Sequence, residues 1–211
     1  MSSLDCWQSP YSVRDVFFRY YALHPEWFLG LTQNESLAQS SIFLYEPDLV
    51  AQIAEFLHLD RGIHSSVQTA AISALDGMGR YRTKIQELLT AVNAGVNHGI
   101  LMSLFRRTVA EIANLESTLP NSFVEALISF VTFIASHASG GNMIVGAGLI
   151  PLLIQLIENN APSRLSVVSK AMQLVDNVVY GFPNAFQLFC NARGIDAVVQ
   201  RIEVSDLSNR K

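Results

Sequence analysis

The chain has 211 residues and a net charge of −4, and 50% of its residues are hydrophobic while only 15% are charged. This length is enough for one or two domains with a sizeable core, and the negative charge argues against a general nucleic-acid binder, which needs a basic surface. Soluble domains carry about 25% charged residues, so we expect part of the surface to be covered by neighbouring repeats of a longer array or by self-association.

The two cysteines, Cys6 and Cys190, are too few for a disulfide framework and suit a reducing compartment. Residues 1–7 lack the basic and apolar segments of a secretory signal. We therefore expect a protein of the nucleus and cytoplasm. Residues 126–157 contain no charged side chain, but residues 137–142 interrupt this stretch, which predicts short buried helices and no membrane span.

Residues 1–45 are rich in aromatic side chains, which we expect to pack on the first repeat. Apolar residues at helical spacing predict a helix within 48–57. Ser65 and Gln68 match a capping box and predict the start of a helix that ends near the glycines at 77 and 79. A further helix is predicted from about 82 to 92.

Gly99 opens the next predicted helix, which runs towards residue 116. Ser122 and Glu125 form a second capping box, and the pair Gly140-Gly141 is expected to end the helix that follows. Later elements are predicted as a short helix at 143–145, an amphipathic helix at 166–180, a short helix at 184–191, a helix from Gly194 and a polar tail at 205–211.

Three glycines open similar apolar helices. Gly99, Gly148 and Gly194 lie 49 and 46 residues apart. A helical period near 45 residues is typical of armadillo and HEAT repeats. The sequence therefore predicts an all-α fold, an armadillo/HEAT-like right-handed α-solenoid of about three to four repeats. The N-terminal segment, 1–45, is followed by armadillo-like repeats over 46–211, at about 46–116, 117–160 and 161–204.

Motifs for catalysis or cofactor binding are missing from the sequence. The glycine-rich stretches at 140–141 and 146–148 lack the Gly-Lys-Ser/Thr of a phosphate loop. No histidine has a ligand partner four residues on, and no Cys-x-x-Cys occurs, so His58 and His64 near Asp60 are interpreted as a hydrogen-bonded turn rather than a metal site. We predict no catalytic residue, no cofactor and no metal ligand.

The candidate binding residues are basic or polar. Arg106, Gln155 and Arg201 each lie seven positions after one of the three glycines, and equivalent positions of a solenoid form a column along one face. This column predicts a groove for an acidic or extended peptide; the alternative is an ordinary solvent-exposed helix face.

Further basic residues are candidates for contact with an acidic partner or a nucleic acid. They are Arg80, Arg82, Lys84 and Arg107. The net negative charge of the chain fits a nucleic acid less well. The alternative is again a solvated surface.

Residues 148–157 look like the third helix of an armadillo repeat. A longer set of matches resembles the N-terminal armadillo-like region of the giant HECT-type E3 ubiquitin ligases, of the Mule type and their fungal relatives. This resemblance covers about 45–211 and is carried by residues 58–61, 123–130, 135–136, 140–141, 171–176, 185–186, 194–195 and 201–203.

The resemblance implies a scaffold fragment that contacts protein substrates and neighbouring repeats of a larger ligase. In that family a cysteine of a C-terminal HECT domain accepts ubiquitin from a conjugating enzyme, and neither Cys6 nor Cys190 matches its setting. A stand-alone armadillo adaptor is the alternative. A nuclear-import receptor is disfavoured because Trp7 and Trp27 both lie near the N-terminus, away from the repeats. An isolated helical enzyme is disfavoured because no catalytic constellation is found.

Overall fold

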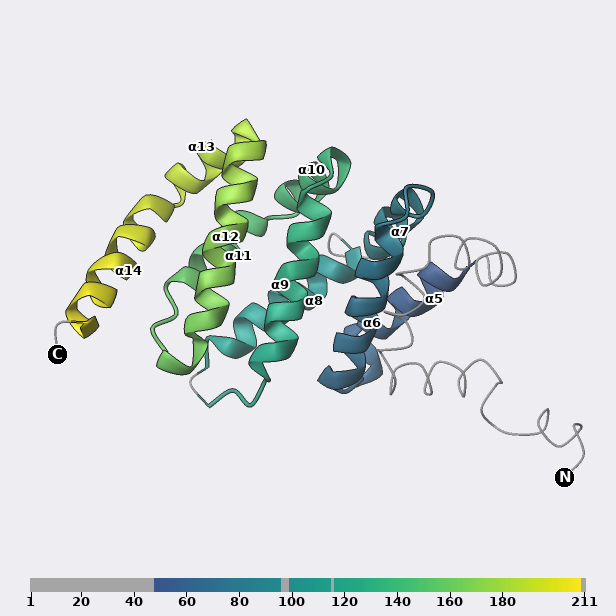
Figure 1. Ribbon diagram of the computed structural model, residues 1–211, viewed down its shortest axis with the longest axis horizontal. Helices are drawn as coiled ribbons and strands as arrows, with labels where there is room; N and C mark the ends of the chain where they lie inside the picture. Colours follow the sequence, from purple (N-terminus) through teal and green to yellow (C-terminus); the bar gives the residue numbers. More distant parts are fainter. Residues whose placement is uncertain (1–47, 96–98, 115, 210–211) are drawn as a thin grey trace, which may run out of the picture.

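The computed structural model describes residues 48–95, 99–114 and 116–209, and these residues form helices and no strand (Figure 1). The prediction of an all-α fold is confirmed, and the packing is that of an α-solenoid. The α-helices are α5 (Leu49–Ala54), α6 (Ser65–Gly79), α7 (Ile85–Val92), α8 (Gly99–Ile112), α9 (Asn121–Ala135), α10 (Ala138–Gly146), α11 (Leu149–Ile157), α12 (Leu165–Gly181), α13 (Pro183–Asn191) and α14 (Gly194–Asn209). Short 3₁₀ helices are η2 (Glu55–Leu57), η3 (Leu59–Arg61) and η4 (Pro162–Arg164). The predicted packing of residues 1–45 lies outside the described residues.

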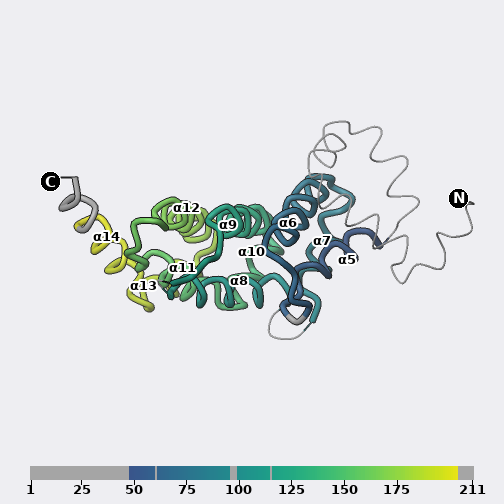
Figure 2. The backbone as a smooth tube through the Cα atoms, turned by 90° about the horizontal axis from the view of Figure 1, so that it is seen from below, coloured from purple at the N-terminus to yellow at the C-terminus, as the bar shows by residue number. Residues whose placement is uncertain are grey.

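The helices form two layers in an elongated row. One layer contains α6, α9 and α12, with α9 packed against both of the others, and the second contains α8, α11 and α14, with α11 in the middle (Figure 2). The order of a long helix, a short helix and a helix of the second layer occurs as α6–α7–α8, α9–α10–α11 and α12–α13–α14. The boundaries of the repeats, their number and the handedness stay predictions.

The period read from the glycines is also visible in the hydrogen bonds between neighbouring helices. The partners of those that join successive units lie 41–47 residues apart, whereas the bond between α6 and η2 spans 12 residues. Between α9 and α12, for example, the Ser166 hydroxyl donates to Glu125 Oε1 at 2.6 Å and Lys170 Nζ donates to Ser129 Oγ at 3.0 Å. Successive three-helix units of the array are therefore joined by polar contacts as well as by their apolar core.

The middle of the array explains the long uncharged stretch of the sequence. On α9, the side chains of Leu127, Val131 and Ile134 are fully buried, and burial of such a side chain contributes about 1.5–3 kcal/mol. Within the described residues, no single helix is long and apolar enough to cross a membrane; only α9 and α10 taken together pass on length and composition, and they are bent by 119°.

Both predicted capping boxes are wrong. The N-cap of α6 is His64, whose Nδ1 accepts a hydrogen bond from the Ser66 amide at 3.3 Å. The N-cap of α9 is Pro120, which has no side-chain acceptor, and Glu125 bonds to α12 instead. The N-cap lies one residue before the predicted Ser65 in α6 and two residues before the predicted Ser122 in α9, so the Ser and Gln or Glu side chains fall within the first two turns.

The pair Gly140-Gly141 does not end a helix but lies inside α10. A Cβ at Gly141 would lie 1.9 Å from the Phe182 ring, and one at Gly140 would lie 2.3 Å from the Ile134 carbonyl oxygen. The missing side chains let α10 approach the end of α9 and the start of α13.

The three glycines that open helices have different roles. Gly99 and Gly148 have φ of +90° and +87°, which favours glycine. In the last unit Arg193 takes the left-handed conformation, with φ of 61°. Gly194 is the first residue of α14 and is needed for packing, because a Cβ there would lie 2.4 Å from the Phe189 ring.

Candidate partner-binding surfaces

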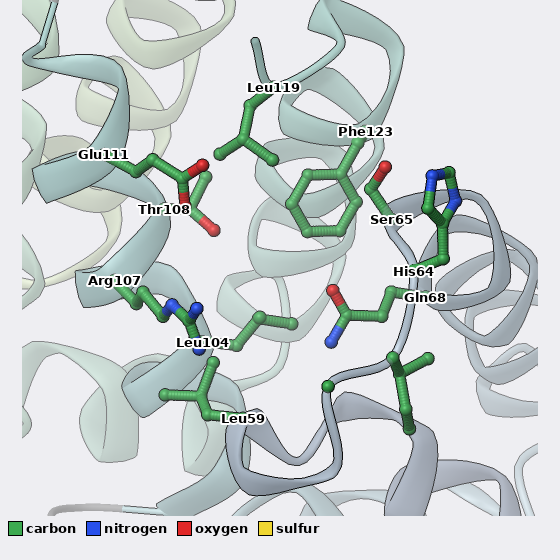
Figure 3. A pocket seen from close by; sticks show the side chains of 12 residues that line it. Leu59, His64, Ser65, Gln68, Leu104, Arg107, Thr108, Glu111, Leu119 and Phe123 are labelled. Carbon is green, nitrogen blue, oxygen red and sulfur yellow. The ribbon is translucent and has the colours of Figure 1, made fainter. Parts of the chain in front are cut away.

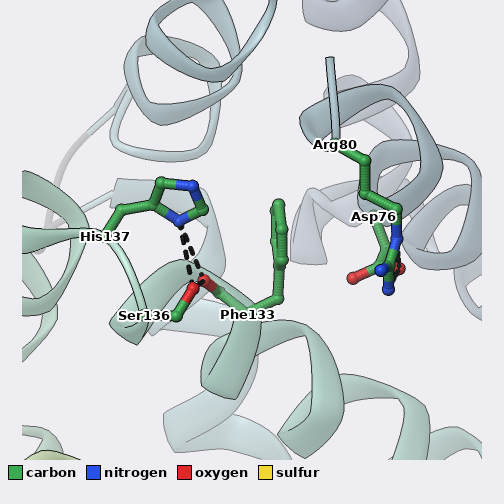
Figure 4. A network of polar contacts seen from close by, with 5 residues as sticks. All are labelled: Asp76, Arg80, Phe133, Ser136 and His137. Carbon is green, nitrogen blue, oxygen red and sulfur yellow. Dashed lines mark hydrogen bonds and ion pairs between the residues drawn. The ribbon is translucent and has the colours of Figure 1, made fainter. Parts of the chain in front are cut away.

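Arg80 belongs to a cluster that joins the ends of α6 and α9 (Figure 4). Its guanidinium donates to Asp76 Oδ2 at 2.7 Å and lies 5.7 Å from the centroid of the Phe133 ring. On the other side of that ring, the His137 imidazole packs edge-on with the centroids 5.0 Å apart. Two-thirds of the Arg80 side chain is still exposed, so the cluster presents a positive charge on an aromatic support.

Lys84 and Arg82 lie in the turn between α6 and α7. Lys84 Nζ donates to Glu87 Oε2 at 2.6 Å and its side chain is only 15% exposed. Arg82 is exposed. Of the three basic residues at this corner, Arg80 and Arg82 are therefore the more accessible to a partner.

Arg106 and Arg201 reach to opposite ends of α11. Arg106 on α8 donates to the carbonyl of Ala147, two residues before α11, at 2.5 Å. Arg201 on α14 donates to the Asn159 carbonyl at 3.1 Å and to Asn160 Oδ1 at 3.0 Å, just beyond the C-cap of α11. Both side chains are half-buried and connect neighbouring units.

Gln155, the middle residue of the predicted column, is exposed on α11. The helices that carry Arg106, Gln155 and Arg201 are neighbours, but the two guanidinium groups contact opposite ends of a nine-residue helix, which is about 13 Å long. The structure thus brings the helices together and keeps the two arginine head groups apart. The role of these residues in partner binding stays a prediction.

Arg164 has a structural role that the sequence did not indicate. It is 7% exposed, and its guanidinium donates to the Leu119 carbonyl at 2.7 Å, to Asn121 Oδ1 at 2.6 Å and to the Ser117 carbonyl at 3.2 Å. This side chain fixes the segment before α9 against the start of α12.

Arg107 lines a pocket with a volume of about 310 Å³ between η3, the start of α6, the second half of α8 and the start of α9 (Figure 3). Arg107 is exposed, and no ion pair or hydrogen bond joins it to another described residue. Apolar walls come from Leu104 and Phe123, and two buried polar side chains, Gln68 and Thr108, also face the pocket. Sequence reasoning found Arg107 but missed the pocket around it.

The C-terminal end of the array exposes apolar side chains. Ile195, Val199 and Ile202 are 49–54% exposed and recur at helical spacing on one side of α14. Phe186 and Leu188 on α13 are 53% and 46% exposed. The end of the row thus exposes apolar side chains of the kind that neighbouring helices bury elsewhere in the array.

Two models of protein families match parts of the chain. Both are described as domains of unknown function: DUF908 matches residues 17–110 and DUF913 matches residues 169–208. No solved structure matches the chain.

The chain is similar to several E3 ubiquitin-protein ligases. It is 28% identical to UPL1 of Arabidopsis thaliana over 78% of its length, 23% identical to ptr1 of Schizosaccharomyces pombe over 81%, and 23% identical to HUWE1 of Mus musculus over 82%. It spans only 4–5% of the length of these relatives. The matches confirm the resemblance to the N-terminal region of large E3 ligases that the sequence indicated.

Proposed function

We propose that this chain is a scaffold and partner-binding part of a HECT-type E3 ubiquitin ligase. The chain is homologous to the N-terminal region of large E3 ubiquitin ligases. The similarity to E3 ubiquitin-protein ligases over about four-fifths of the chain carries this proposal. The helical array supports it, since a solenoid offers an extended surface for binding other proteins. The array would act by positioning bound proteins near a catalytic domain elsewhere in the protein.

The proposed partners are protein substrates and neighbouring repeats of the ligase. A ubiquitin-conjugating enzyme would bind through the HECT domain. The proposed location of the ligase is the nucleus and the cytoplasm. The accessible charged and polar candidates for substrate contact are Arg80, Arg82, Arg107 and Gln155. Arg106, Arg201 and Lys84 are better placed to support that surface, because they already bond within the array.

The first experiment is to read the coding frame beyond Lys211. We expect it to continue into a HECT domain. A stop codon close to Lys211 would contradict the ligase proposal and leave a small armadillo-repeat adaptor, whose peptide partners could then be sought by affinity capture.

A second experiment separates positioning from catalysis in the full-length protein. We expect deletion of residues 48–209 to lower ubiquitination of a protein substrate at least tenfold while ubiquitin is still loaded on the catalytic cysteine at an unchanged rate. The thioester measurement serves as the internal control. A parallel loss of both would contradict a role in positioning alone.

A further inference from the structure

We propose that the pocket between α6, α8 and α9 binds a short segment of a protein partner in which an apolar side chain lies between an acidic and a basic residue. This inference rests on the partner-binding part of the proposed function and assigns it to one site. The pocket combines three features that together suit such a segment: buried polar groups with free hydrogen-bonding capacity, apolar walls and two separate charges at the rim (Figure 3).

The buried polar groups come from Gln68 and Thr108, which are 7% and 3% exposed. Gln68 Nε2 donates to the Phe56 carbonyl at 3.4 Å, which orients the side chain and leaves its Oε1 available as an acceptor. The Thr108 hydroxyl has no hydrogen-bond partner among the described residues. Both side chains point into the pocket in Figure 3.

These two groups complement a peptide unit. Gln68 Oε1 can accept from a backbone N–H, and the Thr108 hydroxyl can donate to a backbone carbonyl. Since no fully enclosed side-chain nitrogen or oxygen lacks a partner among the described residues, the Thr108 oxygen must be open to the pocket rather than sealed in the core. An occupant that supplies no polar group would leave it unpaired, which carries a free-energy cost.

The walls select an apolar side chain. Leu104 of α8 and Phe123 of α9 face the same space, and the volume of about 310 Å³ is at the lower end of the range for ligand pockets, which begins at about 300 Å³. This space suits one large aliphatic side chain with its flanking backbone. A whole helix of a partner would be too large for it.

The rim charges give the occupant a direction. Arg107 and Glu111 lie one turn apart on α8 and are both exposed, yet no ion pair joins them or connects either to another described residue. In Figure 3 the Arg107 guanidinium lies near Leu104 and the Glu111 carboxylate lies nearer Leu119. A carboxylate of the partner pairs with the Arg107 guanidinium, and an ammonium group of the partner pairs with the Glu111 carboxylate.

The test uses fluorescein-labelled peptides with capped ends and the core sequences Asp-Leu-Lys and Lys-Leu-Asp, titrated with the 211-residue chain in a fluorescence anisotropy assay. We expect saturable binding with a clear preference for one of the two orders. Arg107→Glu combined with Glu111→Arg should reverse that preference, and Thr108→Val should weaken the preferred peptide about tenfold.

Arg193→Glu with Glu158→Arg provides the matched control, since both residues are exposed, lie outside the pocket lining and the candidate partner contacts, and undergo the same charge changes. It should change the affinity less than twofold. Thermal unfolding of every variant establishes that it is folded. The proposal is overturned if neither peptide binds, if the charge-swapped variant keeps the original preference, or if the control variant behaves like the pocket variant. None of these outcomes affects the reading-frame test of the ligase proposal.

Discussion

Arg164 shows how a single charged residue can serve as a structural part of the array. Its guanidinium is buried and has no carboxylate partner among the described residues; instead it donates to oxygens of Ser117, Leu119 and Asn121. A guanidinium presents five donors in a fixed plane, which suits several carbonyl oxygens at once. The result is a polar joint between the segment before α9 and the start of α12.

We expect Arg164→Met to lower the free energy of unfolding by about 2–4 kcal/mol, because it keeps the apolar stem but leaves the carbonyl oxygens without donors. Urea unfolding followed by circular dichroism measures this. Arg193→Met is the matched control: that side chain is 84% exposed and pairs only with exposed Asp196, so its loss should cost less than about 0.5 kcal/mol. Equal costs for the two variants would show that the buried joint contributes nothing beyond the surface ion pair.

At the scale of elements, close approach between helices depends on α10. This helix contains adjacent glycines, and the ring of Phe182, which precedes α13, occupies the space next to Gly141. Packing at this density tolerates little added volume. The position of α10 against its neighbours is therefore set by a residue that has no side chain.

We expect Gly141→Val to destabilise the fold by about 2–3 kcal/mol, because the new side chain and the Phe182 ring would occupy the same space. Combined with Phe182→Ala, the total should be at least about 1 kcal/mol smaller than the sum of the two single effects. Gly146→Val on the same helix is the control and should cost about 1 kcal/mol or less, since a Cβ there meets nothing within 4 Å. Additive energies for residues 141 and 182 would contradict the contact.

The sequence predicted the order of the helices well, and the errors have physical causes. Periodic apolar spacing predicted α12, and the break that follows it predicted α13, each to within one residue at either end. Gly140-Gly141 was assigned to a helix end because glycine has a low helix propensity, whereas packing against Phe182 outweighs that propensity in the structure. His64 was missed as a cap because imidazole is not among the usual capping groups.

The candidate surface was less predictable than the helices. Arg107 was singled out from its charge alone, but the pocket beside it also depends on Gln68 and Phe123, which come from other helices. Gln68 was interpreted as part of a capping box, and its true environment depends on how α6 packs against η2 and α9. Such a site needs three-dimensional packing, which one sequence does not supply.

At the scale of the whole molecule, the array ends on an exposed apolar face. Ile195, Val199 and Ile202 lie on one side of α14, and Phe186 and Leu188 of α13 add to the exposed apolar area. Exposed apolar patches mark interaction surfaces or cause association. These exposed apolar residues partly account for the low share of charged residues in the composition.

We expect the 211-residue chain to self-associate through this face as its concentration rises. Ile195→Glu with Ile202→Glu should shift the mass measured by light scattering towards the 23.3 kDa of a monomer, because burying two carboxylates without partners is unfavourable. Gln200→Glu on another side of α14 is the control and should leave the association constant within about threefold, since a surface change costs less than about 0.5 kcal/mol. An unchanged mass for the double variant would exclude this face as the contact.

The spacing of 41–47 residues between hydrogen-bonded partners also bears on how the chain folds during synthesis. Each three-helix unit needs only the unit before it and the next few tens of residues, so docking can begin at the N-terminal end while the ribosome is still translating the C-terminal end. The most recently folded unit then presents an apolar edge, as the unit that ends in α13 and α14 does here. A nascent chain of this kind exposes one aggregation-prone apolar edge at a time, on its most recently folded unit. A chaperone would need to bind only that edge to prevent aggregation.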